Sequence, residues 1–132
     1  MTTVEQLRDA YRRFATGDAA AMAGLLAEGA VYHLPGRHLG GGTLVGRDAV
    51  FRRTVLAARW CDAPPAIELL DVTGAGSLVT SIERLRAQRR EVLLDQPVAV
   101  VWRFEGAECV ELWAHFADQA ACDAFWRDFV PA

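Results

Sequence analysis

The sequence predicts an α+β domain, and three features of its 132 residues support that prediction. Apolar residues with a helical repeat dominate the first half of the chain, with one short strand among them. Four consecutive segments with strand-like alternation follow the Pro64-Pro65 pair, and an aromatic helix follows the last of them. Consecutive antiparallel strands with the helices grouped on one side are typical of α+β folds. A strongly curved sheet of this kind has a concave side that can hold a small molecule.

Two helices are expected at the N-terminus. The segment from Thr3 to Gln6 has the pattern of a capping box, and an apolar face follows it on the first helix. Gly17 is expected to end that helix, and Asp18 to cap a second, short helix whose Met22, Leu25 and Leu26 point inward. Residues 30–34 are a short predicted strand, which the Pro35-Gly36 pair stops.

A glycine-rich segment follows the first strand. Its glycines at 40–42 and 46 match neither the GxGxxG pattern nor a P-loop, so a nucleotide cradle is not expected. We interpret the segment as a flexible flap that carries His38. Residues 47–60 have a helical pattern and form the third predicted helix.

The second half of the chain predicts four strands, near residues 66–73, 77–87, 91–104 and 108–117. In the last strand the apolar residues alternate with Glu111, Trp113 and His115, so one face is apolar and the other is mixed. Asp118 stands where a helix N-cap belongs, and a helical stripe of aromatic residues follows.

Composition excludes several classes of function. The net charge of −3 gives no electrostatic basis for binding nucleic acid. Three cysteines without a CxxC spacing argue for a reducing cytoplasm. The charged N-terminus is not a signal peptide, and no apolar run approaches the roughly 20 residues of a membrane span. Three histidines without a helical i,i+4 pair give no metal signature. We therefore expect one cytoplasmic domain over residues 1–132, without metal, cofactor, nucleic acid or membrane partner.

The element order and four motifs resemble the nuclear transport factor 2-like superfamily, most of all its SnoaL-like and ketosteroid-isomerase-like proteins. The motifs are TGD at 16–18, YHLPGR at 32–37, GRDAV at 46–50 and WAHFADQ at 113–119. The resemblance implies a cone in which a curved mixed sheet wraps around the N-terminal helices, a cystatin-like α+β barrel with a deep pocket. It also implies a homodimer that pairs through the convex sheet face, where Trp113 and His115 are expected.

The chain departs from the ketosteroid isomerases at their catalytic positions. The resemblance puts their aspartate base at Leu34 and their oxyanion-hole acid at Val100. Their catalytic tyrosine falls near Ala10, one place from Tyr11. We therefore reject ketosteroid isomerisation by the standard triad. The aspartate-arginine-aspartate pattern of epoxide hydrolases is not evident either.

The resemblance and the two-residue period together predict the pocket floor. Leu34 from the first strand and two further rows are expected to contact substrate: Gln96, Val98, Val100 and Trp102, and then Leu112, Ala114 and Phe116. A packed core explains most of these positions equally well. Gln96 and Trp102 are the exceptions, because a buried amide or indole N–H needs a hydrogen-bond partner.

Four residues are candidates for catalysis. Tyr32 should face the pocket and could donate a hydrogen bond to a carbonyl, although a purely structural tyrosine is an alternative. Glu83 could be an acid or base with a raised pKa if its strand face is concave, but its register stays open. Arg53 could bind a carboxylate or enolate, or extend to solvent. His38 could close over a ligand or be an exposed loop histidine.

These observations favour a cofactor-free enzyme that acts on an apolar, oxygenated, polyketide-type substrate. Cyclisation, isomerisation or dehydration is the expected reaction, resembling the SnoaL-like polyketide cyclases. A non-catalytic ligand-binding dimer, an epoxide hydrolase of the same fold and a dimerisation module with a filled cone are the alternatives.

Overall fold

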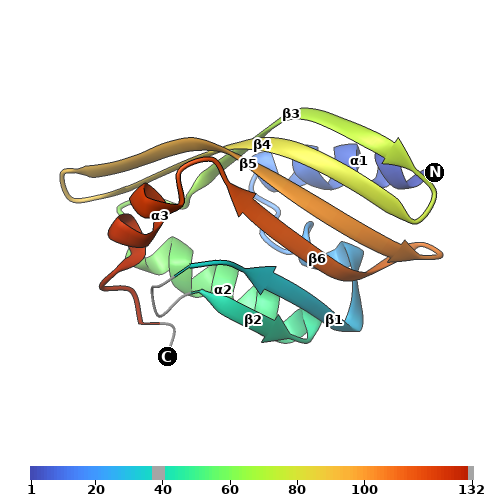
Figure 1. The fold of residues 1–132 in the computed structure, drawn as a ribbon, viewed down its shortest axis with the longest axis horizontal. Helices are drawn as coiled ribbons and strands as arrows, with labels where there is room; N and C mark the ends of the chain where they lie inside the picture. The colour runs from blue at the N-terminus through green and yellow to red at the C-terminus, as the bar shows by residue number, and fades with distance from the viewer. Residues whose placement is uncertain (37–40, 131–132) are drawn as a thin grey trace.

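The computed structural model describes residues 1–36 and 41–130. The elements in chain order are the helix α1 (Thr3–Ala15), the 3-10 helix η1 (Ala23–Leu25), the strands β1 (Leu26–Leu34) and β2 (Gly42–Val45), the helix α2 (Arg47–Trp60), the strands β3 (Ala66–Ala75), β4 (Leu78–Arg89), β5 (Val92–Glu105) and β6 (Glu108–Phe116), and the helix α3 (Gln119–Trp126). The strands form one curved sheet in the order β2-β1-β6-β5-β4-β3 (Figure 1). β1 runs parallel to β6, and the other neighbours are antiparallel. The predicted α+β class with a curved mixed sheet is confirmed.

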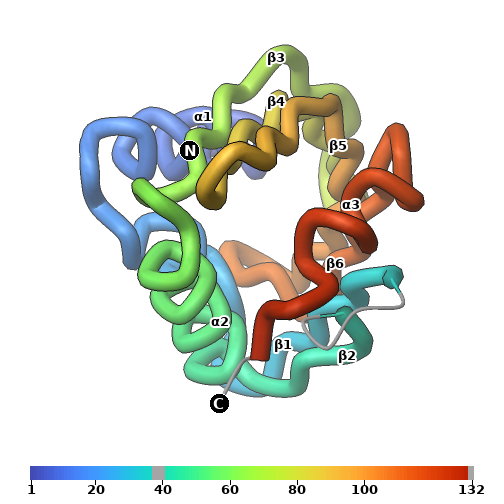
Figure 2. The backbone as a smooth tube through the Cα atoms, turned by 90° about the vertical axis from the view of Figure 1, so that its left-hand side faces the viewer, coloured from blue at the N-terminus to red at the C-terminus, as the bar shows by residue number. Residues whose placement is uncertain are grey.

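The helices lie around the concave side of the sheet. α1 packs mainly against β3, α2 against β1, and α3 against the ends of β5 and β6. Figure 2 shows the three helices and the sheet arranged as a ring. Among the described residues, no helix is both long and apolar enough to cross a membrane. In this arrangement, side chains from several elements surround the middle of the concave side.

The capping box of α1 lies one residue earlier than the sequence suggested. The Thr2 hydroxyl accepts a hydrogen bond from the Glu5 N–H at 3.2 Å, and the Glu5 carboxylate accepts one from the Thr2 N–H at 2.7 Å. The box therefore consists of Thr2 and Glu5, not of Thr3 and Gln6. Below it, Leu7, Ala10 and Tyr11 form the buried face of α1.

The predicted second helix after Asp18 is wrong. The segment forms turns and the short η1, and Leu26 already pairs with Cys109 of β6. The strand thus begins four residues before the predicted residue 30. Pairing with β6 uses backbone groups that a continued helix would need for its own hydrogen bonds.

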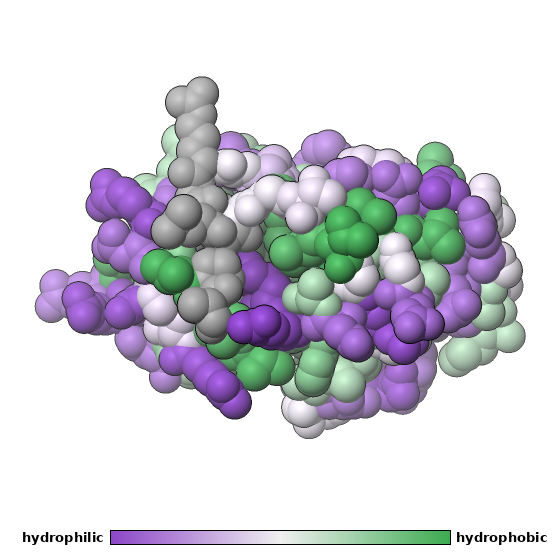
Figure 3. All heavy atoms as spheres, turned by 90° about the horizontal axis from the view of Figure 1, so that it is seen from below, coloured by the Kyte–Doolittle hydropathy of each residue, from purple (hydrophilic) through white to green (hydrophobic). Residues whose placement is uncertain are grey.

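The glycine-rich segment contains an edge strand where the sequence suggested only a loop. Gly42–Val45 pairs antiparallel with β1, and the Gly46 N–H donates to the Ala30 carbonyl at 2.7 Å. Gly42 has a φ of +106°, which turns the chain into this strand. Figure 3 shows apolar side chains beside polar ones on the face formed by β2 and α2. His38 lies outside the described residues.

The inward row on the two long strands is buried as the two-residue period predicted. Trp102, Val100 and Val98 of β5 stand opposite Leu112, Ala114 and Phe116 of β6. All except the half-buried Phe116 are at most 3% exposed. They form one core with the buried face of α1, so side chains fill that part of the cone.

The last helix is fixed to the sheet by one polar clamp. The Asp118 carboxylate accepts a hydrogen bond from the Ala121 N–H at 3.0 Å, which confirms the predicted N-cap. The Gln96 amide donates to the Asp118 carbonyl at 3.0 Å and accepts from the Asp118 N–H at 2.8 Å. The clamp places the aromatic residues of α3 beside α2, where Trp60, Phe125, Trp126 and Phe129 pack together.

Candidate functional site

A cavity of about 1130 Å³ opens on the concave side, where the cone is not filled by the core. Its walls come from the C-terminal half of α1, from α2, from β1 and β3–β6, and from α3. Most of the wall is apolar. The volume is close to the range of roughly 300–1,000 Å³ that is usual for small-molecule sites. A smaller hollow of about 390 Å³ beside Thr2 and Gly76 has no acid or base among its described wall residues.

Glu83 is the acidic residue buried in the cavity wall. It is 8% exposed and stands on β4 between Leu69 of β3 and Val98 of β5. Burial raises the pKa of its carboxyl to about 7, and a hydrogen bond from the Tyr11 hydroxyl partly opposes that rise. The register that the sequence left open is thereby resolved, because the side chain faces the cavity. A carboxyl group with this pKa can either accept or donate a proton near neutral pH.

A chain of buried hydrogen bonds leads to Glu83 from the core. The Trp102 indole N–H donates to the Ser81 hydroxyl at 2.9 Å, and that hydroxyl lies 2.9 Å from the Tyr11 hydroxyl. The indole can only donate, so the Ser81 oxygen accepts from it. When the Tyr11 hydroxyl donates to Glu83, its oxygen can accept the Ser81 proton. This chain also provides the partner that the buried indole of Trp102 requires.

Tyr32 faces the same cavity from β1. Its neighbours across the sheet are Leu44 of β2 and Leu112 of β6. Burial raises the pKa of its hydroxyl, the charge of Glu83 raises it further, and Arg53 acts in the opposite direction. The phenol therefore stays protonated at neutral pH and can donate a hydrogen bond into the cavity.

Arg53 lies in the cavity wall on α2. Its guanidinium carbon is 4.5 Å from the centre of the Phe129 ring and 5.1 Å from that of Trp126. Burial lowers the pKa of Arg53, while Tyr32 and Cys122 nearby raise it. The side chain is half-buried, so of the two alternatives for Arg53 the structure favours the one directed into the cavity.

The predicted substrate-contacting residues divide into three groups. Leu34, Val98 and Phe116 line the cavity. Val100, Trp102, Leu112 and Ala114 do not line the cavity and are buried in the core that also contains the inner face of α1. Gln96 is not in the wall, since both ends of its amide bind the Asp118 backbone.

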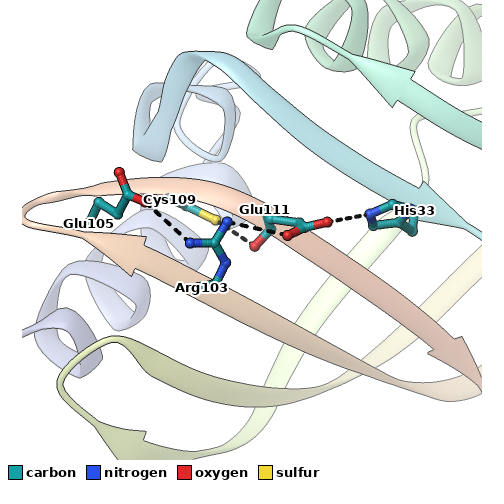
Figure 4. Close-up of polar contacts among 5 residues, drawn as sticks. All are labelled: His33, Arg103, Glu105, Cys109 and Glu111. Atoms are coloured by element: carbon teal, nitrogen blue, oxygen red, sulfur yellow. Dashed lines mark hydrogen bonds and ion pairs between the residues drawn. The ribbon is translucent and has the colours of Figure 1, made fainter.

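The convex face carries a polar network (Figure 4). The Nε2 atom of His33 lies 2.7 Å from a Glu111 carboxylate oxygen, and Arg103 bridges Glu111 and Glu105 at 3.3 Å each. The hydrogen bond with His33 holds the pKa of Glu111 below its ordinary value, and Arg103 contributes. The His33 ring also stacks on Trp113, with 5.4 Å between the centroids. His33, Trp113 and Glu111 thus belong to the face opposite the cavity.

Two residues beside Glu83 were not chosen from the sequence. From the sequence, Tyr11 was noted only as the neighbour of the position that the resemblance gives to the ketosteroid-isomerase tyrosine, and Ser81 was not a candidate. The sequence contains a signal for both residues. Ser81 is two residues before Glu83 and therefore points to the same face of the strand, and Tyr11 is one residue from the position of the ketosteroid-isomerase tyrosine. Among the described residues, no group of three histidine, cysteine, aspartate or glutamate side chains is arranged to hold a metal ion.

Comparison with known proteins gives concordant findings. The model of the SnoaL-like domain matches residues 7–112. The uncharacterised protein Rv0034 of Mycobacterium tuberculosis is 30% identical over 124 residues, which cover 93% of this chain and 95% of that protein. Bal32a, encoded by a soil-derived mobile gene cassette, superposes with a TM-score of 0.87 at 30% identity and covers 95% of this chain and 96% of its own.

Two further solved structures share the fold. A protein of unknown function from Xanthomonas campestris with a cystatin-like fold has a TM-score of 0.86 at 27% identity, over 96% of this chain and 98% of its own. IdmH, a proposed polyketide cyclase from Streptomyces antibioticus, has a TM-score of 0.71 at 17% identity, over 89% and 93%. The cystatin-like architecture expected from the resemblance is therefore confirmed.

Proposed function

The chain belongs to the SnoaL-like family, and on that premise we propose that it is a cofactor-free enzyme acting on an apolar, oxygenated substrate. The proposed reaction is a cyclisation, isomerisation or dehydration that begins or ends with a proton transfer at carbon or oxygen. The observation that supports this most is the buried carboxyl group of Glu83, which faces a largely apolar cavity and has a pKa of about 7.

Glu83 fits the role of the general acid or base. Near neutral pH about half of the molecules hold an ionised carboxylate that can remove a proton, and the remainder can donate one. An apolar surrounding keeps bulk water from competing for that proton. The Tyr11 hydroxyl, itself hydrogen-bonded to Ser81, stabilises the ionised form of the carboxyl group.

The other wall residues fit binding and polarisation. The Tyr32 hydroxyl can donate a hydrogen bond to a carbonyl oxygen and so stabilise an enolate formed when Glu83 removes a neighbouring proton. Leu34, Val98 and Phe116 would shape the apolar part of the substrate. Holding a flexible chain in a reactive conformation can contribute roughly 7–11 kcal/mol in favourable intramolecular reactions.

The structural likeness to IdmH is consistent with cyclisation of a polyketide-type substrate, but at 17% identity it supports the fold alone. The alternative of a non-catalytic binding protein shares the same cavity. The described wall residues include no aspartate, so the geometry gives no support to the aspartate-based epoxide hydrolase alternative.

Proton exchange offers a direct test. Apolar β-keto esters in D₂O should exchange their α-protons faster with the wild-type protein than without it, as followed by ¹H NMR. Glu83→Gln and Tyr32→Phe should lower this rate by about 10²–10⁴-fold, because each removes a positioned proton donor or acceptor. His115→Ala and His33→Ala are the controls and should exchange at the wild-type rate, since both residues belong to the convex face.

The outcomes of the exchange experiment distinguish an enzyme from a non-catalytic binding protein. Full exchange activity in both pocket variants would refute the proton-transfer role. Binding of the esters to the wild-type protein without any acceleration would identify a binding protein instead.

A further inference from the structure

The orientation of Arg53 within the cavity is set by aromatic rings. Its guanidinium group lies over Phe129 and Trp126, which are 1% and 5% exposed. Rings of this kind attract a cation to their faces and restrict its rotation. A guanidinium group carries its N–H donors in one plane, an arrangement that matches a carboxylate or another planar anion. Arg53 is therefore a cation held beside aromatic rings in the wall of the cavity, where it can attract an anion.

The charge around the cavity differs from that of the whole protein. The chain has a net charge of −3, yet its described wall contains four arginines and only two glutamates. Of the arginines, Arg8, Arg12 and Arg59 are exposed, whereas Arg53 is half-buried. Tyr32 interacts electrostatically with both Arg53 and Glu83, and all three residues line the same cavity. Arg53 thus favours negative charge in the site, while Glu83 can exchange a proton.

We propose that the cavity selects an apolar molecule with a single anionic group, such as a carboxylate, sulfonate, phenolate or enolate, and that Arg53 binds this group in the plane of its guanidinium. The inference rests on the proposed function only in taking this cavity as the substrate site. The apolar body of the ligand would then extend past Tyr32 towards Glu83.

Two fluorescent dyes with the same ring system test this inference. 1-Anilinonaphthalene-8-sulfonate (ANS) is an anion, and N-phenyl-1-naphthylamine (NPN) is its neutral counterpart. Arg53→Gln should weaken ANS binding by about tenfold to a hundredfold, the usual effect of losing a charge-assisted hydrogen bond, and should change NPN binding by less than about threefold. Arg52→Gln is the matched control, because it removes the same charge from an exposed neighbour on the same helix that does not line the cavity.

Arg53→Lys should bind ANS more tightly than Arg53→Gln, since it keeps the charge. The Arg53→Lys variant has no Nε–Hε group at residue 53. The Nε–Hε peak that is present in the ¹⁵N–¹H spectrum of the wild-type protein and absent from that of the variant therefore belongs to Arg53. That peak should move on addition of ANS and stay in place with NPN. This readout needs no folded Arg53→Gln variant.

Three results would overturn the inference: an unchanged ANS affinity in Arg53→Gln, an equal loss in Arg52→Gln, or an Arg53 peak that ANS does not move. The anion-binding role of Arg53 and the proposed enzymatic function can be refuted independently. Glu83→Gln should still bind ANS, so loss of proton exchange with retained ANS binding supports the enzyme. Glu83-dependent exchange together with ANS binding that is independent of Arg53 refutes only the anion site.

Discussion

Glu83→Gln should make the protein more stable at alkaline pH. The folded structure raises the pKa of the Glu83 carboxyl from 4.5 to about 7, mainly because the ionised form loses its hydration on burial. Between these two pH values the folded protein holds a proton that the unfolded chain has already released. Unfolding therefore releases a proton, and the free energy of unfolding falls as the pH rises through this window. Glutamine is neutral at every pH and carries no such penalty.

The size of the effect follows from the shift. A change of one pKa unit corresponds to about 1.36 kcal/mol, so a rise of about 2.5 units corresponds to roughly 3 kcal/mol. The variant should gain that amount relative to wild type between pH 4.5 and pH 8, in addition to any constant difference. For a chain of 132 residues this amounts to about 10 °C in melting temperature.

Urea unfolding of both proteins at several pH values measures the difference. The protein concentration should be held constant, because self-association would add to the apparent stability. Other groups that titrate in this window act equally on both proteins and cancel. Glu91→Gln is the control, since Glu91 is exposed at the β4–β5 turn, and its difference from wild type should not depend on pH in this way. A Glu83→Gln difference that stays constant from pH 4.5 to 8 would refute the buried, proton-holding carboxyl group.

Three further predictions concern the core, the hydrogen-bond chain and the convex face. Leu112→Asp should cost more than about 3 kcal/mol in urea unfolding, because it places an unpaired carboxyl group in the core; an unchanged melting temperature would place Leu112 at the surface. Ser81→Ala should cost about 1–3 kcal/mol by leaving the Trp102 indole N–H unpaired, and adding Trp102→Phe to it should cost less than the two single losses together. We also propose a homodimer through the convex sheet face, so light scattering at micromolar concentration should show a dimer that Trp113→Glu dissociates and His115→Ala weakens; a monomeric wild-type protein would contradict this.

The periodicity of the chain was sufficient to predict the long strands and their inward faces. Alternation along residues 108–116 depends only on the two-residue repeat of a strand, which any sheet that buries one face enforces. The N-cap at Asp118 was likewise predictable, because capping needs only a local side chain and the next turn of backbone. The motifs that resemble the family added the cone, which periodicity does not predict.

Features that depend on partners distant in sequence were not predictable in this way. Leu26 belongs to a strand rather than to a helix because Cys109 of β6 pairs with it. The side of the sheet that Glu83 occupies depends on its register with Val98 and Leu69, and its pKa depends on its burial and on the Tyr11 hydroxyl from α1. Whether an inward residue lines a cavity or only fills the core is equally non-local: Val98 and Leu112 are both buried in one core, yet of the two only Val98 borders the cavity. A one-dimensional pattern specifies which face a side chain takes, whereas burial, charge and accessibility arise from the elements that pack against that face.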